Sequence, residues 1–396
     1  MPTPLEGMTV LDLTENVAGP YCTKLLALYG AEVIKVEAPG VGDAARQMPP
    51  FVHTTPGTER SLVYLYLNTS KKSITLNLRS EAGRDLLRRL VPQVDVLVES
   101  FAPPTMASLG LDYQTLRELN PRLVMTSITW FGQEGPYAQL KGEEILAQAL
   151  SGNLLITGEP DREPVRIGGN FAQYTGGQAA YVATMMALLP ALLSGTGQHV
   201  DCSISEANSD LLDSWGINSI LGTKQPRTGM HHHGGYPAEL YECKDGYVAV
   251  GTGPAGWDAL VEVVGREELR DPKYADPATR KSLRPEIDSM IHDWLKHTSK
   301  IEAYHAGQAK RLAFGYLMTP ADMLASRQLQ AREYFKELDH PATGTVKYPG
   351  PPFTYSEATW QLSRAPLLGE HNAEVYGQRL GLSPEDLQQL SQAGVL

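Results

Sequence analysis

The sequence has 396 residues, of which 42% are hydrophobic and 20% are charged, which is the balance of an ordinary globular protein. This length suffices for two or three domains, each with a hydrophobic core of its own. The formal net charge of -11 argues against a nucleic-acid-binding protein, because phosphate-rich partners favour surfaces with surplus lysine and arginine.

Cysteine usage and hydropathy indicate a reduced compartment and no membrane span. The three cysteines, Cys22, Cys202 and Cys243, are far apart and form neither a CxxC pair nor a disulfide framework. The first residues lack the charged-then-apolar pattern of a signal peptide. The longest apolar stretch, 179–193, contains Pro190 and is shorter than the roughly 20 residues of a membrane helix, so it predicts a buried helix. These features predict a cytoplasmic protein.

Apolar stretches alternate with helical patterns through the first half of the chain. The strands expected from these stretches are 8–13, 33–36, 62–66, 73–78, 94–98, 123–128 and 199–204. The helices expected between them are 20–30, 81–91, 143–150 and 178–193. Strands that alternate with helices imply an α/β fold with a mostly parallel sheet, which helices cover on both faces.

The composition changes at about Arg227. A hairpin is expected at 239–250 with its turn at 244–246, and an amphipathic helix follows around Ile287, Met290, Ile291, Trp294 and Leu295. We interpret residues 225–325 as a smaller α+β domain. Beyond it, many turn residues precede a short C-terminal helix, which the hydroxyl group of Ser383 can cap.

Several local patterns suggest ligand binding but lack the context that such sites require. The pattern GxGxxG occurs at 251–256, yet residues 265–272 do not read as the second strand of a dinucleotide-binding fingerprint, which favours a simple turn. The adjacent histidines 231–233 cannot easily converge on one ion, so a polar loop is favoured and no metal site is predicted. Glu143 and Glu144 begin a predicted helix, where capping competes with a catalytic role.

A series of segments occurs in a fixed order along the whole chain. They are 16–43 (NVAGPYCTKLLALYGAEVIKVEAPGVGD), 72–78 (KSITLNL), 109–113 (LGLDY), 120–128 (NPRLVMTSI), 131–137 (FGQEGPY), 148–152 (QALSG), 197–203 (GQHVDCS), 339–341 (DHP) and 368–371 (LGEH). As a set they resemble the class III CoA-transferases, the family that includes formyl-CoA transferase, the carnitine CoA-transferase and α-methylacyl-CoA racemase.

The resemblance implies a Rossmann-like large domain built from both ends of the chain, 1–224 plus 326–396, together with an interlocked dimer. It also implies coenzyme A or an acyl-CoA as substrate, with no permanently bound cofactor. Val17 and Ala18 lie in the N-terminal signature, where formyl-CoA transferase has an active-site glutamine. A CoA site needs cations for its phosphates. The cations in family-like positions are Arg46, Lys71, Lys72 and Lys141, and we expect at least two of them to touch CoA.

The segment that carries the nucleophile differs from the family pattern. In the transferases it typically reads Ala-Asp-Tyr-Thr-Ala-Gly, and its Asp attacks the acyl-CoA carbonyl to form a mixed anhydride and then an enzyme-bound CoA thioester. Residues 172–177 read Ala-Gln-Tyr-Thr-Gly-Gly, so Gln173 stands at the position of the nucleophile. A carboxamide has no anionic oxygen and cannot form the anhydride, so chemistry from this position is expected to be lost.

Other positions of the expected pocket also depart from the family. The racemases pair their Asp with a His in a Gly-His-Asp segment, whereas here Gly142 is followed by Glu143 and Glu144. Glu144 aligns with the acid that the transferases carry there and could orient a substrate or intermediate. Ala102 replaces the Arg of an Asn-Phe-Arg-Pro segment, and Trp130 replaces a Gly.

Three functions are consistent with this pattern. The first is one subunit of a heteromeric CoA-transferase, similar to the two-subunit succinyl-CoA:benzylsuccinate enzymes, in which a paralogous partner supplies the Asp. A succinyl-CoA donor and an aromatic or dicarboxylic acid acceptor would fit that assembly, a heterodimer or heterotetramer. The second is a self-sufficient homodimeric transferase that uses Glu143 or Glu144, and the third is a non-catalytic CoA-binding scaffold. We favour the first, because an amide is a very poor nucleophile.

Overall fold

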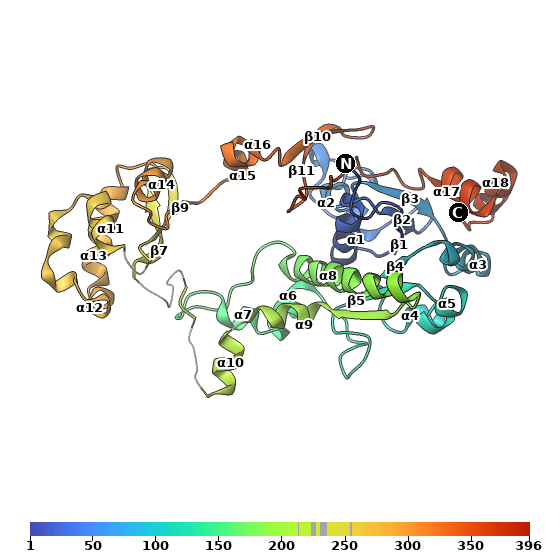
Figure 1. The fold of residues 1–396 in the computed structure, drawn as a ribbon, viewed down its shortest axis with the longest axis horizontal. Helices are drawn as coiled ribbons and strands as arrows, with labels where there is room; N and C mark the ends of the chain where they lie inside the picture. The colour runs from blue at the N-terminus through green and yellow to red at the C-terminus, as the bar shows by residue number, and fades with distance from the viewer. Residues whose placement is uncertain (213, 223–226, 230–235, 254–255) are drawn as a thin grey trace. The chain divides into compact units, whose positions relative to one another are not determined.

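Two compact units make up the part of the chain that the computed structural model describes, residues 1–212, 214–222, 227–229, 236–253 and 256–396 (Figure 1). The larger unit contains both chain ends and consists of Met1–Leu154, Arg166–Leu221 and Arg332–Leu396. The smaller unit consists of Leu155–Val165 and Gly222–Ala331.

This division assigns 155–165 to the smaller unit, whereas the sequence-based boundaries put that segment in the larger domain. Within the smaller unit, the side chain of Arg227 donates hydrogen bonds to the carbonyl groups of Leu155, Glu159 and Arg162. These contacts connect residues far apart in the sequence, so composition alone does not reveal them.

A six-stranded sheet in the order β3-β2-β1-β4-β5-β6 organises the larger unit. All of its strand pairs are parallel, which confirms the predicted sheet. The central strands are buried along their whole length, as expected when helices cover both faces. The strands are β1 (Thr9–Leu13), β2 (Glu32–Glu37), β3 (Lys71–Thr75), β4 (Val96–Glu99), β5 (Val124–Thr129) and β6 (His199–Ser203).

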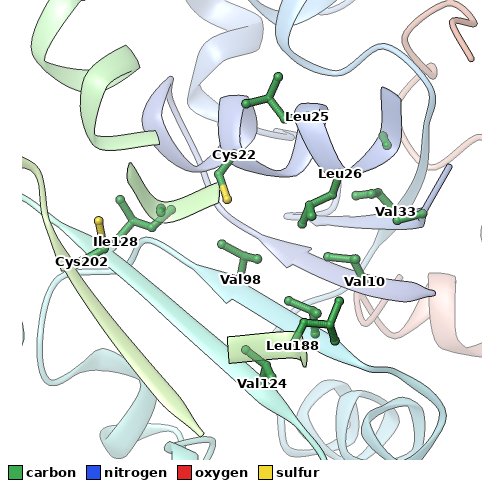
Figure 2. Close-up of a cluster of buried hydrophobic side chains, with 14 of the residues drawn as sticks. Val10, Cys22, Leu25, Leu26, Val33, Val98, Val124, Ile128, Leu188 and Cys202 are labelled. Atoms are coloured by element: carbon green, nitrogen blue, oxygen red, sulfur yellow. The ribbon is translucent and has the colours of Figure 1, made fainter. Parts of the chain in front are cut away.

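Helices α1 (Ala18–Leu28) and α8 (Phe171–Ser194) pack on one face of this sheet. Figure 2 shows the resulting core, in which Cys22 and Leu26 from α1 meet Val98 from β4 and Leu188 from α8. The free cysteines Cys22 and Cys202 are packing residues of this core, and Cys243 is buried in the core of the smaller unit.

The opposite face is covered by helices from both halves of the sequence. They are α3 (Glu81–Leu90), α5 (Tyr113–Leu119), α17 (Asn372–Leu380) and α18 (Pro384–Gln392). The hydroxyl group of Tyr376 donates to the carbonyl oxygen of Thr75 at 2.9 Å, which ties the C-terminal helices to β3. Ser383 caps α18 in a capping box with Asp386, as the sequence predicted.

One expectation for the larger unit is corrected by the structure. The segment 62–66 is not a strand but helix α2 (Leu62–Leu67), because the hydroxyl group of Ser61 caps it by accepting the N–H of Tyr64. The structure also has a hairpin that was not predicted, formed by β10 (Phe335–His340) and β11 (Gly344–Pro349).

Helix α8 is longer than expected at its N-terminal end and continues through Pro190 to Ser194. It is the one described helix with the length and apolar composition of a membrane span, and 44% of its most apolar 18-residue window is buried. Its packing on α1, β5 and β6 makes it a core helix of the larger unit. The remaining helical elements of this unit are η1 (Ala44–Gln47), η2 (Val52–Thr54), η3 (Val91–Gln93), α4 (Thr105–Ser108), α6 (Glu144–Leu150), α9 (Ile204–Ser209), η4 (Asp210–Leu212) and α10 (Ser214–Ile220), and the boundary between the two units falls within α7 (Asn153–Ile156).

The smaller unit packs helices against a three-stranded antiparallel sheet of β7 (Ala238–Cys243), β8 (Gly246–Gly251) and β9 (Gly315–Tyr316). The β7–β8 pair is the predicted hairpin. Helix α13 (Arg284–Leu295) buries Ile287, Ile291 and Leu295, as its periodicity predicted.

The other helical elements of the smaller unit are α11 (Trp257–Val264), η5 (Glu267–Arg270), η6 (Pro272–Tyr274), α12 (Pro277–Ser282), α14 (Lys300–Ala309), α15 (Pro320–Ala325) and α16 (Arg327–Ala331).

Candidate functional site

The strand order of the large sheet reverses between β1 and β4. From β1 the chain adds β2 and β3 on one side, and from β4 it adds β5 and β6 on the other. Ligands of open α/β sheets bind in the crevice outside the carboxyl ends of the strands at such a reversal. The residues that follow β1 and β4, from Thr14 and from Ser100 onward, therefore occupy the position of a ligand site.

A cavity of about 310 Å³ lies at this point of the larger unit. It brings together three residues predicted from the sequence, Ala18, Lys141 and Gln173. Two positions that depart from the family pattern, Ala102 and Trp130, line it as well. The predicted nucleophile position and the diverged positions thus belong to one site.

Gln173 lies in the first turn of α8 and is only 8% exposed. Its side-chain amide makes no hydrogen bond with the described residues and borders the cavity. The structure therefore leaves the amide available to a bound molecule.

Glycines bring the first turns of α8 into close contact with the rest of the site. A Cβ atom on Gly177 would lie 2.3 Å from the carbonyl oxygen of Ala18, so only glycine allows α8 to approach α1 this closely. A Cβ atom on Gly142 would lie 2.2 Å from the ring of Trp130, which packs directly on that residue. Gly142 and Gly177 are thus required for the close packing around the cavity.

Glu144 acts as the cap of α8. Its Oε1 atom accepts the backbone N–H of Ala172 at 2.7 Å and the side-chain amide of Gln148 at 2.8 Å, and its Oε2 atom accepts the N–H of Gln173 at 3.2 Å. Asn170, which precedes the helix, makes no side-chain cap of its own. The carboxylate of Glu144 is therefore engaged in fixing the backbone under Gln173.

Glu143 is exposed and precedes α6 without making a side-chain cap. It is absent from the described lining of the cavity, and so is Glu144. The geometry accordingly gives neither glutamate the free, cavity-facing carboxylate that a replacement nucleophile needs.

Glu15 is a site residue that the sequence analysis missed. Among the described residues that line the cavity, it is the only acid, and Lys141 is the only cation. Burial raises the pKa of the Glu15 carboxyl group, and the nearby charge of Asp43 adds to this effect. The signal available in the sequence was its place directly after the first strand of a parallel sheet.

The backbone beside Glu15 is held in an unusual conformation. Asn16 has φ +69°, in the left-handed region that asparagine tolerates better than most residues. The N–H of Asn16 donates to Asp43 and the N–H of Glu15 donates to the hydroxyl group of Ser100, both at 2.9 Å. These bonds fix the loop that leads from β1 into α1.

A larger cavity of about 990 Å³ lies along the carboxyl ends of β1, β2 and β3. It shares Glu15 and Phe101 with the smaller cavity, so the two spaces adjoin at these side chains. The exposed Arg79 lines the larger one and was also missed, although it directly follows the family-like segment 72–78.

Three of the four predicted cations are paired within the protein. The buried guanidinium group of Arg46 binds Glu37 at 2.7 Å and Glu59 at 2.6 Å. Lys71 is buried against Asp12 at 2.9 Å, and Lys72 bridges two surface glutamates. These carboxylates are distant in sequence, so the pairing was not predictable, and only Lys141 of this group lines the cavity at Gln173.

Val17 is fully buried at the N-cap of α1, and its side chain does not line either cavity in the described structure. Its neighbour Ala18 does line the smaller one. The signature that contains both residues therefore contributes the start of α1 to the site.

For the other two motifs, the glycine pattern at 251–256 and the histidines at 231–233, the described parts of the chain show no ligand-binding site. Residues 267–274 after α11 form short helical turns, so no second strand follows the glycine pattern there. Histidines 231–233 lie outside the described residues. No group of three or more metal-binding side chains occurs among the residues that the structure describes.

Comparisons with known proteins agree with the resemblance seen in the sequence. The profile of CoA-transferase family III matches residues 5–372. A formyl-CoA:oxalate CoA-transferase of Streptomyces coelicolor is 34% identical over 411 aligned residues, which cover 99% of both chains. A succinyl-CoA:glutarate CoA-transferase of Homo sapiens is 33% identical over 99% of this chain and 90% of its own length. The crystal structure of a CAIB/BAIF family protein from Brucella suis matches with a TM-score of 0.87 at 33% identity, over 96% of this chain and 100% of that one.

Proposed function

The chain belongs to CoA-transferase family III, and from this premise we propose that it is one subunit of an acyl-CoA:carboxylate CoA-transferase whose nucleophilic carboxylate comes from a paralogous partner chain. The observation that carries the proposal is the neutral amide of Gln173 in the first turn of α8, facing the cavity. The family uses an acyl-CoA as its substrate, and no permanently bound cofactor is part of the proposal.

The chemistry explains why an amide at this position calls for a partner. A carboxylate oxygen attacks the acyl carbonyl, the carbon–sulfur bond breaks and CoA leaves as a thiolate. The thiolate then attacks the enzyme carboxyl carbon, which releases the first acid and leaves an enzyme-bound CoA thioester. The acceptor carboxylate reverses these two steps. The neutral amide of Gln173 has no anionic oxygen with which to begin.

The two adjoining cavities fit the two ends of an acyl-CoA. The larger one has room for the nucleotide, and Arg79 supplies a cation for its phosphates. The smaller one has room for the acyl group beside Gln173, with Lys141 as the cation for a substrate carboxylate. Backbone N–H groups at the start of α1 favour negative charge at the same place.

The substrates that we propose follow from the relatives. Those relatives act on formyl-CoA with oxalate and on succinyl-CoA with glutarate, as their names state. We propose a succinyl-CoA-type donor and a dicarboxylic or aromatic acid acceptor for the assembly, working in the cytoplasm.

The surface of α8 supports an assembly with a second chain of the same fold. Val182, Met186, Leu189 and Leu193 recur at helical spacing and are 49%, 72%, 61% and 80% exposed. Such a continuous apolar stripe marks an interaction surface. We propose that it lies in the interface of an interlocked dimer, with the paralogous chain as partner.

The test is purification of the tagged chain from its source cells, followed by native mass spectrometry and an assay for CoA exchange between two acids. We expect a one-to-one complex with a sister chain that has Asp at the position of Gln173, and exchange activity only in the complex. A homodimer that exchanges CoA at a rate which the partner does not raise would contradict the proposal. Binding of CoA with no exchange by any assembly would support the scaffold interpretation.

A further inference from the structure

A row of polar side chains crosses three strands of the large sheet on the face opposite α8. Glu99 on β4 pairs in register with Ser127 on β5, which pairs with Asp201 on β6. Successive residues of a strand face opposite sides of the sheet. Thr126, the neighbour of Ser127 on β5, accordingly faces α8, where its hydroxyl group forms a hydrogen bond of 2.8 Å with that of Thr184. The row is not part of either cavity described above.

Hydrogen bonds connect this row from the interior to the surface. Glu99 is only 2% exposed, and its Oε2 atom accepts the N–H of Phe101 at 2.8 Å. Ser127 is the cross-strand neighbour of Glu99, its hydroxyl group favours the charged form of the Glu99 carboxyl group, and its Oγ atom lies 2.9 Å from Nε2 of His199. His199 is exposed on the edge strand β6, so a buried acid is linked to solvent through one hydroxyl group and one imidazole.

A separate cavity of about 140 Å³ adjoins the row. It is lined by Glu99, Ser127 and His199, and two further lining atoms, the hydroxyl oxygen of Tyr113 and Nε2 of Gln133, are buried without a hydrogen-bond partner in the described structure. Buried polar atoms of this kind are normally satisfied by water, and the volume is sufficient for several molecules. The surroundings of Glu99 are therefore suited to proton exchange.

Burial and hydrogen bonding have opposite effects on the pKa of Glu99. Burial raises the pKa of its carboxyl group to about 7, although the bonds from Ser127 and Phe101 oppose this, and the charge of Asp201 adds to it. Although the residue as a whole is exposed, desolvation of the imidazole lowers the pKa of His199, and the charge of Asp201 opposes this shift. Asp112 caps the N-terminus of α5; burial alone would raise the pKa of its carboxyl group, but the bonds from the backbone and side chain of Thr115 outweigh burial and lower it. Tyr113 stacks on His199, and burial raises the pKa of its hydroxyl group.

Phe101 connects this row to the proposed acyl-CoA site. Its side chain lines both the smaller and the larger cavity, and it lies two residues after Glu99. Ser100, between them, holds the backbone of Glu15. The carboxyl group of Glu99 therefore fixes the loop on which the two cavities meet.

We propose that Glu99 is a positioning residue that couples acyl-CoA binding to the release of a proton, because its ionised carboxylate holds the backbone of Phe101 more tightly than its neutral form does. The ionised form accepts the N–H of Phe101 and the O–H of Ser127, while Nε2–H of His199 donates to Ser127. On protonation the Glu99 O–H donates to Ser127, the Ser127 hydroxyl turns to Nε2, and the imidazole proton moves to Nδ1. The neutral carboxyl group holds Phe101 more weakly, since bonds to charged acceptors are the stronger.

This inference rests on the proposed binding of CoA, and the experiment separates the two. Binding of coenzyme A to the full chain is measured by calorimetry from pH 6 to pH 8.5. We expect the affinity of the wild type to fall about 10-fold from pH 8 to pH 6, because binding favours the deprotonated form. Glu99→Gln should lose this part of the pH dependence. The phosphomonoester of CoA titrates near pH 6 itself, but it contributes equally to both proteins.

Two further variants protect the test against a folding defect. Ser127→Ala removes a bond that favours the charged form of Glu99, so its pH dependence should persist with a midpoint at higher pH. Glu206→Gln, which replaces an exposed carboxylate on α9, should match the wild type. The same pH dependence in the wild type and in Glu99→Gln would overturn the inference while leaving the proposed function intact. A failure of the wild type to bind CoA at any pH would overturn the proposed function itself.

Discussion

At the scale of single residues, the neutral amide at position 173 decides what this side chain can do. Gln is one methylene group longer than the Asp of the family pattern, and its carboxamide lacks the negative charge and the nucleophilic oxygen of a carboxylate. The backbone below it is still held in place, because Glu144 accepts the N–H groups of Ala172 and Gln173. The proposed function therefore assigns the reactive carboxylate to a partner chain, while the backbone that supports position 173 is held within this chain.

Replacing the amide should therefore create a reactive carboxylate. Gln173→Asp introduces the acid that the family carries, and we expect CoA exchange between succinyl-CoA and an acid to rise by about 100-fold or more in the chain alone. Mass spectrometry of the denatured protein should detect a covalent CoA thioester on this variant. Gln173→Asn is the matched control, since it has the length of Asp and stays uncharged. Equal activity in both variants would contradict the assignment of this position.

Glu144 and Glu143 form a matched pair for testing the capping role. Glu144→Gln leaves one carbonyl oxygen and places an amide N–H₂ opposite a backbone N–H, so we expect a loss of about 1–2 kcal/mol in the free energy of unfolding. Glu143→Gln changes an exposed side chain and should stay within about 0.5 kcal/mol of the wild type. Urea unfolding followed by circular dichroism measures both. A larger effect at Glu143 would contradict the capping interpretation.

At the scale of elements, the site depends on how closely α8 approaches α1 and α9. Gly177 lies against the carbonyl oxygen of Ala18, and Gly176 lies against Ile204 at the start of α9. Because a Cβ atom on Gly177 would meet a backbone oxygen, no change of side-chain rotamer could make room for a larger residue there. The first turn of α8 is placed by this contact, and the position of Gln173 follows from it.

A methyl group on Gly177 should consequently separate the two helices. We expect Gly177→Ala to lower the free energy of unfolding by about 1–3 kcal/mol and to weaken CoA binding, since the walls of the smaller cavity move apart. Gly377→Ala on α17 is the control, because the nearest atom to its Cβ would be 3.8 Å away. That variant should be neutral or more stable by about 0.5–1 kcal/mol, owing to the better helix propensity of alanine. Equal losses in the two variants would mean that close packing at Gly177 is not what matters.

At the scale of the whole molecule, buried ion pairs connect strands inside the larger unit, whereas an exposed apolar stripe on α8 is available for contact with another chain. Asp12 is buried with Lys71, and although burial alone would raise the pKa of its carboxyl group, Lys35 and Lys71 outweigh burial and lower it. These pairs connect β1 to β2 and β3 inside the larger unit. The stripe on α8, by contrast, leaves apolar side chains without cover in the single chain.

Charges on that stripe should prevent assembly without unfolding the chain. We expect Met186→Glu combined with Leu189→Glu to shift the protein to a monomer in size-exclusion chromatography and native mass spectrometry, because burying two carboxylates in an interface is unfavourable. The far-ultraviolet circular dichroism should be unchanged, since both side chains are exposed. Gln388→Glu on α18 serves as the control for added charge. An unchanged oligomeric state in the double variant would place the interface elsewhere.

Much of the fold was predictable because the large sheet is parallel and buried on both faces. Its strands are continuous apolar runs separated by helical patterns, so β1, β2, β4 and β5 were recognisable from local sequence. The segment 62–66 was not, because apolar runs of this length suit a strand or a buried helix equally, and the cap from Ser61 decided for the helix.

The sequence by itself determined the family, the α/β architecture and the neutral amide at position 173, since each of these depends on residue identity and order. Only the tertiary structure decided which charged groups are free. Arg46 and Lys71 are neutralised by carboxylates from other strands and turns, whereas Glu15 lines the cavity beside Gln173 and Glu99 is buried next to a separate cavity. The physical reason is that the environment of a charge depends on its neighbours in space, and a parallel sheet assembles those neighbours from distant parts of the chain.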